Sequence, residues 1–198
     1  MIESRSDYNY YVNCDKIALK IPEKRIFPRP YLDEIWKYEI TLRKTEYHHN
    51  ISGKIHRIFY AIYRLKLEKI GIKLGFSIPI NVFGPGLSIA HRGTIVINPQ
   101  CKIGKNCRIH EGVTVGATNG SNYAPIIGDN CFLGSGAKVI GEIIIGDNVA
   151  IGANSFVNKN FESNVTIAGV PAKIISKKTS ERNIVKATEI YEERRNRK

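Results

Sequence analysis

One histidine has neighbours that make it a candidate for proton transfer. His91 lies within the stretch GLSIAHRGTIVI, residues 86–97, where apolar and small residues surround it. An imidazole titrates near neutral pH, so it can accept a proton from a hydroxyl group and later return it. A hydroxyl is a poor nucleophile until that proton is being removed. The position of His91 therefore favours general-base chemistry on an alcohol, provided that the fold leaves the ring accessible.

The elements that would position His91 follow from an internal repeat of six residues. Aliphatic residues recur at this period, and only Ser121 breaks the series. The series consists of Ile103, Ile109, Val115, Ile127, Leu133, Val139, Ile145, Ile151 and Val157. A period of six predicts a parallel β-helix, in which three hexapeptides form one triangular coil. Each aliphatic then stacks about 4.8 Å from its counterpart in the next coil.

Two further positions of the repeat fit the same architecture. Three residues after most of these aliphatics the chain has Asn or Gly, which tolerate a positive φ and can therefore form the corners of a coil. These residues are Asn106, Gly112, Asn130, Gly136, Asn148 and Asn154. One position later the residues are small or slim, as an interior site beside a bulky aliphatic requires. They are Cys107, Val113, Cys131, Ala137, Val149 and Ser155, which predicts that both cysteines are core residues.

The repeat also sets the expected limits of the β-helix. We expect a β-helix domain over residues 76–175, with its coils between about 77 and 168. An earlier aliphatic register slips by two residues before Ile103. That register consists of Phe83, Ile89 and Ile95. Residues 117–126, ATNGSNYAPI, interrupt the repeat with turn-forming residues, which predicts a loop that protrudes from one corner.

Helices are predicted on both sides of the β-helix. Residues 1–75 form an N-terminal helical segment, with helices over 30–47 and 52–74 and with Ser52 as a cap. In the second helix, the apolar residues that recur at helical spacing are Ile55, Ile58, Phe59, Ile62 and Leu65. Residues 176–198 form a basic C-terminal helix that ends in a tail.

The charge of the chain favours an anionic partner. Thirty Lys and Arg against 18 Asp and Glu give a net charge of +12, while 42% hydrophobic residues allow a substantial core. No nucleic-acid recognition motif accompanies the charge, so nucleic acid is not an expected partner. The basic faces of the helices are either solvated surfaces or sites of peripheral contact with an anionic membrane. The basic side chains of the second helix are Lys54, Arg57, Arg64, Lys66, Lys69 and Lys73.

The cysteines and the first residues indicate the compartment. The stretch MIESRSDYNYYVNC lacks the apolar segment of a secretory signal, and no run of eighteen apolar residues occurs. The cysteines form no CxxC pair and have no zinc-site spacing; they are Cys14, Cys101, Cys107 and Cys131. We therefore expect reduced thiols in a cytoplasmic protein, at the inner membrane surface if the basic helices contact lipid.

Three motifs resemble those of a known enzyme family. The stretches SIAHRGTIVI, IHEGVTVG and TIAGVPAKII are similar to the serine O-acetyltransferase family of hexapeptide-repeat acyltransferases, over about residues 75–175. The likeness is greatest to the short branch associated with surface polysaccharides. It implies a left-handed β-helix, His91 as the catalytic histidine, acetyl-CoA as acyl donor and no metal. It also implies a homotrimer, with the CoA groove between subunits.

The repeat offers a partner for His91. With the two-residue slip counted, Glu111 stacks one coil above His91, because each lies two residues after an aliphatic of the repeat. A carboxylate there would fix the imidazole tautomer and stabilise its protonated form. The alternative is an exposed glutamate without a role. His110 is expected to point the other way.

The resemblance also implies positions for the two substrates. Small residues along the groove and nearby lysines match CoA-binding positions: Ala117, Gly136, Ala153, Lys159, Ala168, Gly169 and Lys173. For the acceptor we expect contacts from Arg92, Asn119 and Tyr123, with Arg92 or a backbone N–H stabilising the oxyanion.

Two departures from the family bear on the acceptor. Phe76 occupies the place of an aspartate that precedes the catalytic histidine in the family, and Ala124 replaces a histidine before the proline of the loop. Those groups help to hold the amino acid in the family. Their absence favours a hydroxyl of a sugar or glycan precursor as acceptor, with L-serine as the alternative.

Two other classes of protein share this architecture. A γ-type carbonic anhydrase needs three histidine ligands for zinc, whereas only His91 and His110 fall within the β-helix. A non-catalytic β-helix scaffold would show the same repeat without binding CoA, because a fold does not fix a function.

Overall fold

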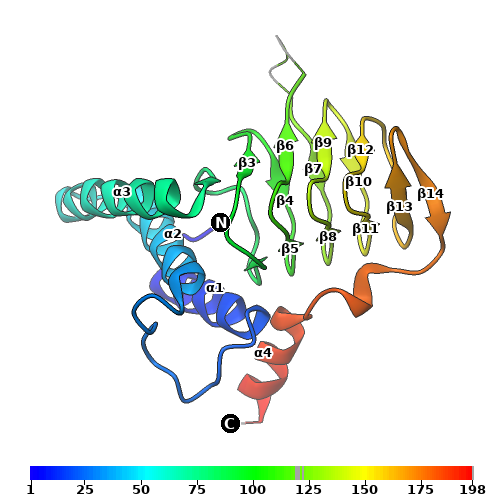
Figure 1. Cartoon of the computed structure of the whole chain (residues 1–198). Coiled ribbons are helices and arrows are strands. Elements are labelled where there is room, and N and C mark those ends of the chain that lie inside the picture. The colour runs from blue at the N-terminus through cyan, green and yellow to red at the C-terminus, as the bar shows by residue number, and fades with distance from the viewer. Residues whose placement is uncertain (119–120, 122, 198) are drawn as a thin grey trace.

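The computed structural model describes residues 1–118, 121 and 123–197. Their core is a left-handed parallel β-helix, as predicted, with helices packed at one end (Figure 1). One sheet contains, in order, β1 (Phe76–Ser77), β3 (Ile95–Ile97), β6 (Thr114–Gly116), β9 (Lys138–Ile140) and β12 (Phe156–Val157). A second contains β4 (Lys102–Ile103), β7 (Ile126–Ile127) and β10 (Ile144–Ile145). The third contains β2 (Ser88–Ile89), β5 (Arg108–Ile109), β8 (Phe132–Leu133), β11 (Ala150–Ile151), β13 (Thr166–Gly169) and β14 (Ala172–Ser176).

The aliphatic positions of the repeat form the interior of the β-helix. Each of the nine aliphatics that define the period is at most 4% exposed. The strands stack in parallel register, for example Ile109 on Leu133, and within the described residues only β13 and β14 pair antiparallel. Cys107 and Cys131 are buried beside the aliphatics, as the repeat predicts, and Cys14 and Cys101 are buried free thiols as well. Burial raises the pKa of the Cys131 thiol to about 12.

The predicted corners have the backbone geometry that their residue types allow. All six corner residues have positive φ angles, between 53° and 77°. Four asparagines on one edge also hydrogen-bond to one another through their side-chain amides. The amide of Asn106 donates to Asn130 (2.9 Å), that of Asn130 to Asn148 (3.0 Å) and that of Asn148 to Asn164 (2.9 Å). Asparagine therefore both accommodates the turn and links successive coils.

The two-residue slip of the repeat lies at one particular corner. Ile89 is in register with Ile109, twenty residues later, but Ile97 is in register with Val115, eighteen residues later. The two additional residues therefore lie between β2 and β3, at the corner that contains His91. This corrects the expected register, because Ile97 rather than Ile95 is the counterpart of Val115.

The helices of the N-terminal segment differ in detail from the prediction. Helix α2 (Glu34–Asn50) and helix α3 (Lys54–Leu74) correspond to the two predicted helices, but the residue at the N-terminal cap of α3 is Gly53 and not Ser52. Helix α1 (Arg5–Ala18) was not predicted. Its aromatic and basic residues do not alternate clearly between an apolar and a polar face, so periodicity gave no signal.

Buried carboxylates complete the open end of the β-helix. The first coil has no coil beneath it, so its backbone N–H groups need other acceptors. Helices α1 and α2 provide Asp15, Glu39 and Glu46, each at most 2% exposed. The bonds run from Gly86 (2.8 Å) and Leu87 (2.9 Å) to Asp15, from Ile89 (3.0 Å) to Glu39 and from Asn81 (2.8 Å) to Glu46.

A buried arginine links these carboxylates to the same coil. Arg43 on α2 is 0% exposed and pairs with Asp15 (2.7 Å) and Glu46 (2.9 Å). Its guanidinium also donates to the carbonyl oxygens of Phe83 (2.9 Å) and Gly84 (2.7 Å). The helical segment is thus joined to the β-helix through charged groups that are satisfied by the backbone of the first coil.

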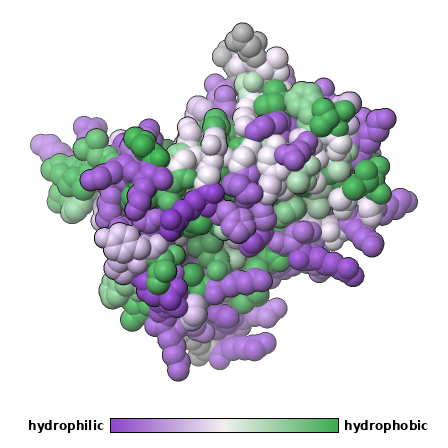
Figure 2. Space-filling view, viewed as in Figure 1, coloured by the Kyte–Doolittle hydropathy of each residue, from purple (hydrophilic) through white to green (hydrophobic). Residues whose placement is uncertain are grey.

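The apolar stripe of α3 faces away from the rest of the chain. The five residues that follow helical spacing are 41–74% exposed, so this apolar face is not packed on the β-helix. Helix α3 is anchored by its opposite face, through Leu67, Gly71 and Leu74. It extends away from the β-helix (Figure 1), and apolar side chains cover much of its visible surface (Figure 2).

The C-terminal residues return to the N-terminal helices. A short 3₁₀ turn (Ser180–Arg182) is followed by helix α4 (Ala187–Asn196), a shorter helix than predicted, which lies against α1. Thr188 of α4 both accepts from the Asn106 side chain (2.8 Å) and donates to it through its N–H (3.1 Å). Within the described residues, no helix has the length and apolar character needed to cross a bilayer.

Candidate active site

His91 lies on the irregular corner between β2 and β3. The N–H of Ala90 still bonds to the carbonyl of Ile109 in the next coil (2.9 Å), so the backbone is fixed up to the residue before the histidine. The two additional residues then turn the chain outward, and His91 is exposed. Gly93 closes the corner with φ of 135°, where a Cβ atom would lie 3.0 Å from that of Glu111. A glycine is therefore required where the corner meets the next coil.

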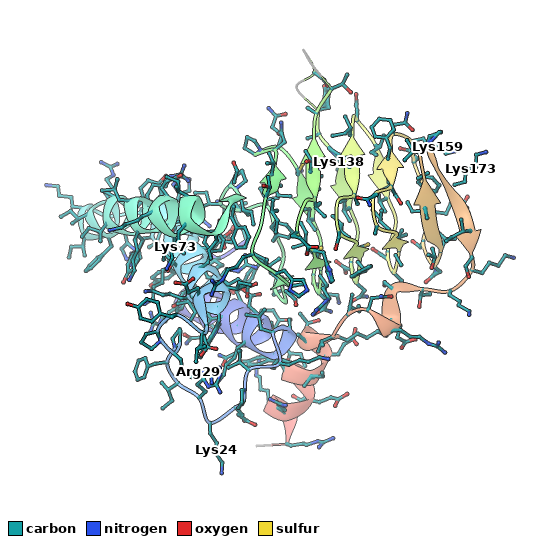
Figure 3. All side chains as sticks on the ribbon, in the orientation of Figure 1. Lys24, Arg29, Lys73, Lys138, Lys159 and Lys173 are labelled. Atoms are coloured by element: carbon teal, nitrogen blue, oxygen red, sulfur yellow. The ribbon has the colours of Figure 1, made fainter. Side chains whose placement is uncertain are left out.

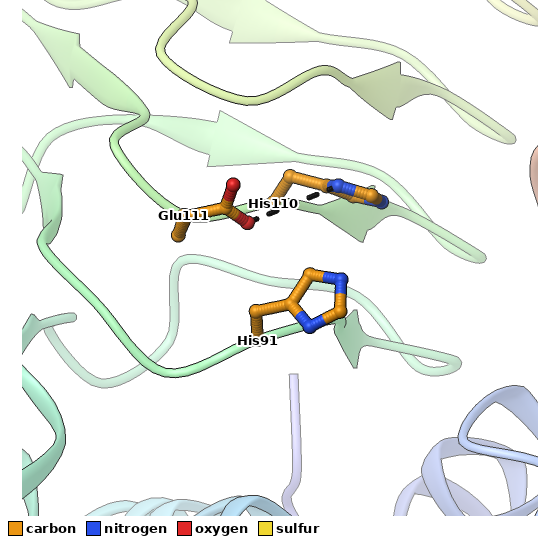
Figure 4. A group of neighbouring side chains, drawn as sticks. All are labelled: His91, His110 and Glu111. Carbon is orange, nitrogen blue, oxygen red and sulfur yellow. Dashed lines mark ion pairs between the residues drawn. The ribbon is translucent and has the colours of Figure 1, made fainter.

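Two residues of the next coil meet His91 at this corner (Figure 4). One possible ligand atom from each of His91, His110 and Glu111 lies within 4.8 Å of the other two. The imidazole rings of His91 and His110 are 5.4 Å apart at an interplanar angle of 81°. The structure therefore brings Glu111 to His91, as the repeat predicts. It contradicts the expectation that His110 points away. The two additional residues between β2 and β3 form a bulge at this corner, and the bulge places the rings of His91 and His110 on the same side of the β-helix.

The environment sets the charge of the two partners. The nearby Ser135 hydroxyl and a backbone N–H hold the pKa of the Glu111 carboxyl below its usual range. Burial lowers the pKa of His110, and the positive charge of Arg108 lowers it further. Nδ1 of His110 lies 3.9 Å from Oε2 of Glu111 and 3.3 Å from the Ser135 hydroxyl. Near neutral pH the corner thus combines a carboxylate with a neutral imidazole.

Glu111 has one oxygen without a partner. Its Oε2 atom is buried and accepts no hydrogen bond from the described residues. A buried carboxylate oxygen without a donor is unfavourable, so a cation bound at this position would be stabilised.

Arg92 has partners other than those predicted. Its guanidinium donates to the carbonyl of Tyr31 (3.0 Å) and pairs with Glu34 at the start of α2 (3.3 Å). These contacts hold Arg92 toward the helical segment. A role for Arg92 in binding the oxyanion stays a prediction, and a backbone N–H is the better candidate in this conformation.

The predicted CoA-binding residues follow the β-helix away from His91. Lys159 lies two residues after the end of β12 and Lys173 lies in β14, and both project from the far end of the β-helix (Figure 3). The ladder β3–β6–β9–β12 separates Lys159 from the His91 corner by three steps, or about 14 Å along the axis. Both lysines are exposed, as are Ala153 and Gly169, while Ala117 and Ala168 are half-buried.

One of these small residues also has a packing role. A Cβ atom at Gly136 would lie 2.1 Å from Oδ1 of Asn154 and displace that side chain, and the φ of 74° already favours glycine whether or not a ligand binds. The loop contributes Tyr123, which is 63% exposed, whereas Asn119 lies outside the described residues. The structure therefore leaves the acceptor contacts of this loop as predictions.

Sequence reasoning missed Ser135 and the part played by His110. Ser135 follows β8, one coil beyond His110, and restrains its ring. A signal for this stacking was present, because His110 and Ser135 occupy neighbouring positions after equivalent aliphatics. The orientation of His110 was not encoded in the period, since it depends on the bulge between β2 and β3.

The fold and this corner define a class: a left-handed β-helix of hexapeptide repeats with a histidine-carboxylate cluster at one corner. Residues 124–159 match the family described as Bacterial transferase hexapeptide (six repeats). A serine acetyltransferase of Buchnera aphidicola is 42% identical over 142 residues, which cover 65% of this chain and 54% of the relative. One from Staphylococcus xylosus is 40% identical over 120 residues, covering 59% and 55%. The chain thus spans about half the length of these relatives.

Solved structures extend the likeness to most of this chain. Serine acetyltransferase from Brucella abortus superposes with a TM-score of 0.72 at 25% identity, covering 90% of this chain and 73% of that one. Its complex with coenzyme A gives a TM-score of 0.66 at 25% identity, covering 89% and 71%. The relatives named here are serine acetyltransferases, and none of them is described as a polysaccharide-associated enzyme.

Proposed function

We propose that this chain is an acetyl-CoA-dependent O-acetyltransferase whose general base is His91. The observation that carries the proposal is the exposed imidazole at a bulged corner, within reach of the Glu111 carboxylate. Similarity to serine acetyltransferases, one of them solved with coenzyme A, supports the acyl donor.

The corner provides the groups that direct acetyl transfer requires. His91 removes the proton of the acceptor hydroxyl while the oxygen attacks the thioester carbonyl. Glu111 stabilises the imidazolium that forms. A backbone N–H is suited to bind the tetrahedral oxyanion, which collapses as the carbon–sulfur bond breaks. The imidazolium then returns its proton to the departing CoA thiolate, so the products are an ester and free CoA, and no nucleophilic side chain is needed.

We propose L-serine as the first acceptor to test. The names of the relatives favour it over the sugar hydroxyl expected from the sequence. One observation keeps the sugar as a second candidate. Phe76, which occupies the place of the family aspartate, is 7% exposed and packs on Tyr38 with ring centroids 5.1 Å apart. Phe76 is therefore a core residue, and its apolar ring cannot replace the aspartate as a charged partner for the ammonium of an amino acid.

The assembly and compartment are part of the proposal. We propose a homotrimer in which CoA lies along an intersubunit groove, with Lys159 and Lys173 near its phosphates. Both lysines are exposed at one end of the β-helix, which supports this placement. The four buried free thiols support a reducing, cytoplasmic location. Light scattering on the purified chain measures the assembly, and a monomer would contradict it.

We further propose that α3 contacts an anionic membrane surface. Its outward face combines exposed Ile58, Ile62 and Leu65 with Lys66 and Lys69, a pattern that suits an interfacial amphipathic helix. Sedimentation with vesicles tests this. Binding should require anionic lipid and fall in K66E/K69E, whereas equal recovery with neutral and anionic vesicles would contradict it.

An assay of thioester consumption tests the reaction. Wild type, His91→Ala and Glu111→Gln are each supplied with acetyl-CoA and either L-serine or one of a panel of sugars. Loss of the base should lower the rate by about 10²–10⁴-fold, and loss of the carboxylate should lower it less. Thermal stabilisation by CoA should persist in both variants. Turnover that survives in His91→Ala would contradict the mechanism, and an absence of both turnover and CoA stabilisation would favour the scaffold.

A further inference from the structure

The corner that holds His91 also has the composition of a metal site. Two imidazoles and a carboxylate converge there, with one possible ligand atom of each within 4.8 Å of the others (Figure 4). This donor set suits Zn²⁺ and Co²⁺, which take nitrogen from histidine and oxygen from Asp or Glu. Such ligand atoms lie about 2.0–2.2 Å from the ion, so small side-chain rotations would bring all three to one centre.

An independent observation points to a cation at the same place. The buried Oε2 atom of Glu111 has no hydrogen-bond donor among the described residues. It faces Nδ1 of His110 at 3.9 Å, a separation that leaves the carboxylate oxygen unsatisfied. A cation bound between the carboxylate and the imidazoles would satisfy that oxygen.

We propose that His91, His110 and Glu111 bind one divalent transition-metal ion of the zinc type. Three protein ligands leave a fourth position to water, the arrangement of an open tetrahedral site. The site is half on the surface, with His91 exposed and the other two residues intermediate, so an ion can enter from solvent.

The surroundings limit the movement of the His110 ring. The Ser135 hydroxyl contacts Nδ1 of His110 (3.3 Å), and the ring of Phe132 packs edge-on against the same imidazole (5.1 Å). These contacts limit the rotation of His110. Gly93 leaves room beside Glu111, because a Cβ atom there would lie 3.0 Å from the glutamate Cβ, a tight contact.

The consequence for activity rests on the proposed function. An ion bound to His91 would occupy the imidazole that the proposed reaction uses as its base, so the site acts as an inhibitory site and not as a cofactor site. Zinc should therefore inhibit acetyl transfer, and a chelator should restore it.

Cobalt absorption spectroscopy and calorimetry test binding without relying on activity. Chelator-treated wild type is titrated with Co²⁺ and with Zn²⁺, beside His110→Asn and Glu111→Gln. A second histidine pair makes a control necessary, because Nδ1 of His48 and Nδ1 of His56 are 3.2 Å apart. His56→Asn removes that pair and should leave the corner site intact. All of these positions are half-buried or exposed, and thermal unfolding verifies that each variant is folded.

The proposal predicts a binding event that depends on the corner residues. His110→Asn and Glu111→Gln should each weaken it on the order of tenfold or more, since even outer-shell changes alter metal affinity by about 10–100-fold. Unchanged affinity and stoichiometry in both variants would overturn the site. Loss of binding in these variants, with retention in His56→Asn, would establish it. If the wild type then lacked transferase activity, the proposed function would fail while the metal site stood.

Discussion

The β-helix and the helical segment at its open end are stabilised by opposite kinds of interior. In the β-helix, aliphatic side chains stack between coils and the backbone of each coil bonds to the next. At the open end, the first coil bonds instead to Asp15, Glu39 and Glu46, with Arg43 among them. The backbone groups of one coil find hydrogen-bond partners only where another coil follows. Where it stops, groups from elsewhere in the chain must satisfy its backbone.

The strongest test of this difference is removal of the buried arginine. Arg43→Met leaves two buried carboxylates without their cation and two carbonyl groups without a donor. Breaking one partner of a buried ion pair costs about 3–5 kcal/mol, so we expect a loss of this size in the free energy of unfolding. Urea denaturation measures it.

A matched control separates this effect from the loss of any arginine. Arg64 on α3 pairs with Glu68, but the two side chains are 41% and 52% exposed. Arg64→Met should therefore change stability by about 0.5 kcal/mol or less. Similar losses in both variants would contradict the view that burial makes the Arg43 cluster important.

The corresponding test in the β-helix removes one member of the asparagine series. Asn148→Ala deletes a bond given to Asn164 and one received from Asn130, at a residue with φ of 59°. Two net hydrogen bonds at about 0.5–1.5 kcal/mol each, plus the left-handed backbone at about 1–2 kcal/mol, predict a loss of roughly 2–5 kcal/mol.

A second variant, Asn148→Gly, separates the contribution of the side-chain hydrogen bonds from that of the left-handed backbone conformation. Glycine adopts the left-handed conformation freely but makes no side-chain bond. It should therefore be more stable than Asn148→Ala by about 1 kcal/mol in the same denaturation experiment. Equal stability of the two variants would mean that the backbone conformation contributes nothing at this corner.

The same contrast explains which features were predictable from the sequence. The buried aliphatics, the corner asparagines and the approach of Glu111 to His91 follow from the period, because each coil repeats the geometry of the last. The orientation of His110 was not predictable in this way, since the bulge between β2 and β3 is where the period fails. Arg43 and Glu39 carry no periodic signal, because a charged residue on a helix is usually solvated. The exposure of the apolar stripe on α3 was not predictable either, because helical spacing shows that a face is apolar and not what covers it.

The buried carboxylates at the open end should also make the stability of the protein depend on pH, which the aliphatic interior of the β-helix does not. Burial, together with the negative charge of Asp15, raises the pKa of Glu39 well above its usual value. A group whose pKa is raised by folding contributes stability that is fully present below its unfolded pKa and is lost as pH rises through its folded pKa. The wild type should therefore lose stability with rising pH relative to Glu39→Gln.

Thermal unfolding of the two proteins from acid to alkaline pH measures this. Below the unfolded pKa of a glutamate they should differ least, because Glu39 is then protonated in both states and the amide can still accept the Ile89 N–H. Parallel profiles across the whole range would show that the carboxyl does not titrate as its burial implies.

The smallest effect is expected on the outward face of α3, and it tests whether that face is free. Ile62 is 53% exposed, while Leu67 on the same helix is 3% exposed and packs toward the rest of the chain. Ile62→Ala should change the free energy of unfolding by about 0.5 kcal/mol or less, since more than half of this residue is exposed to solvent. Leu67→Ala should cost about 2–5 kcal/mol, because it opens a cavity. A large, concentration-dependent loss in Ile62→Ala would contradict the free face, because only a second copy packed on the stripe would make that side chain part of a core.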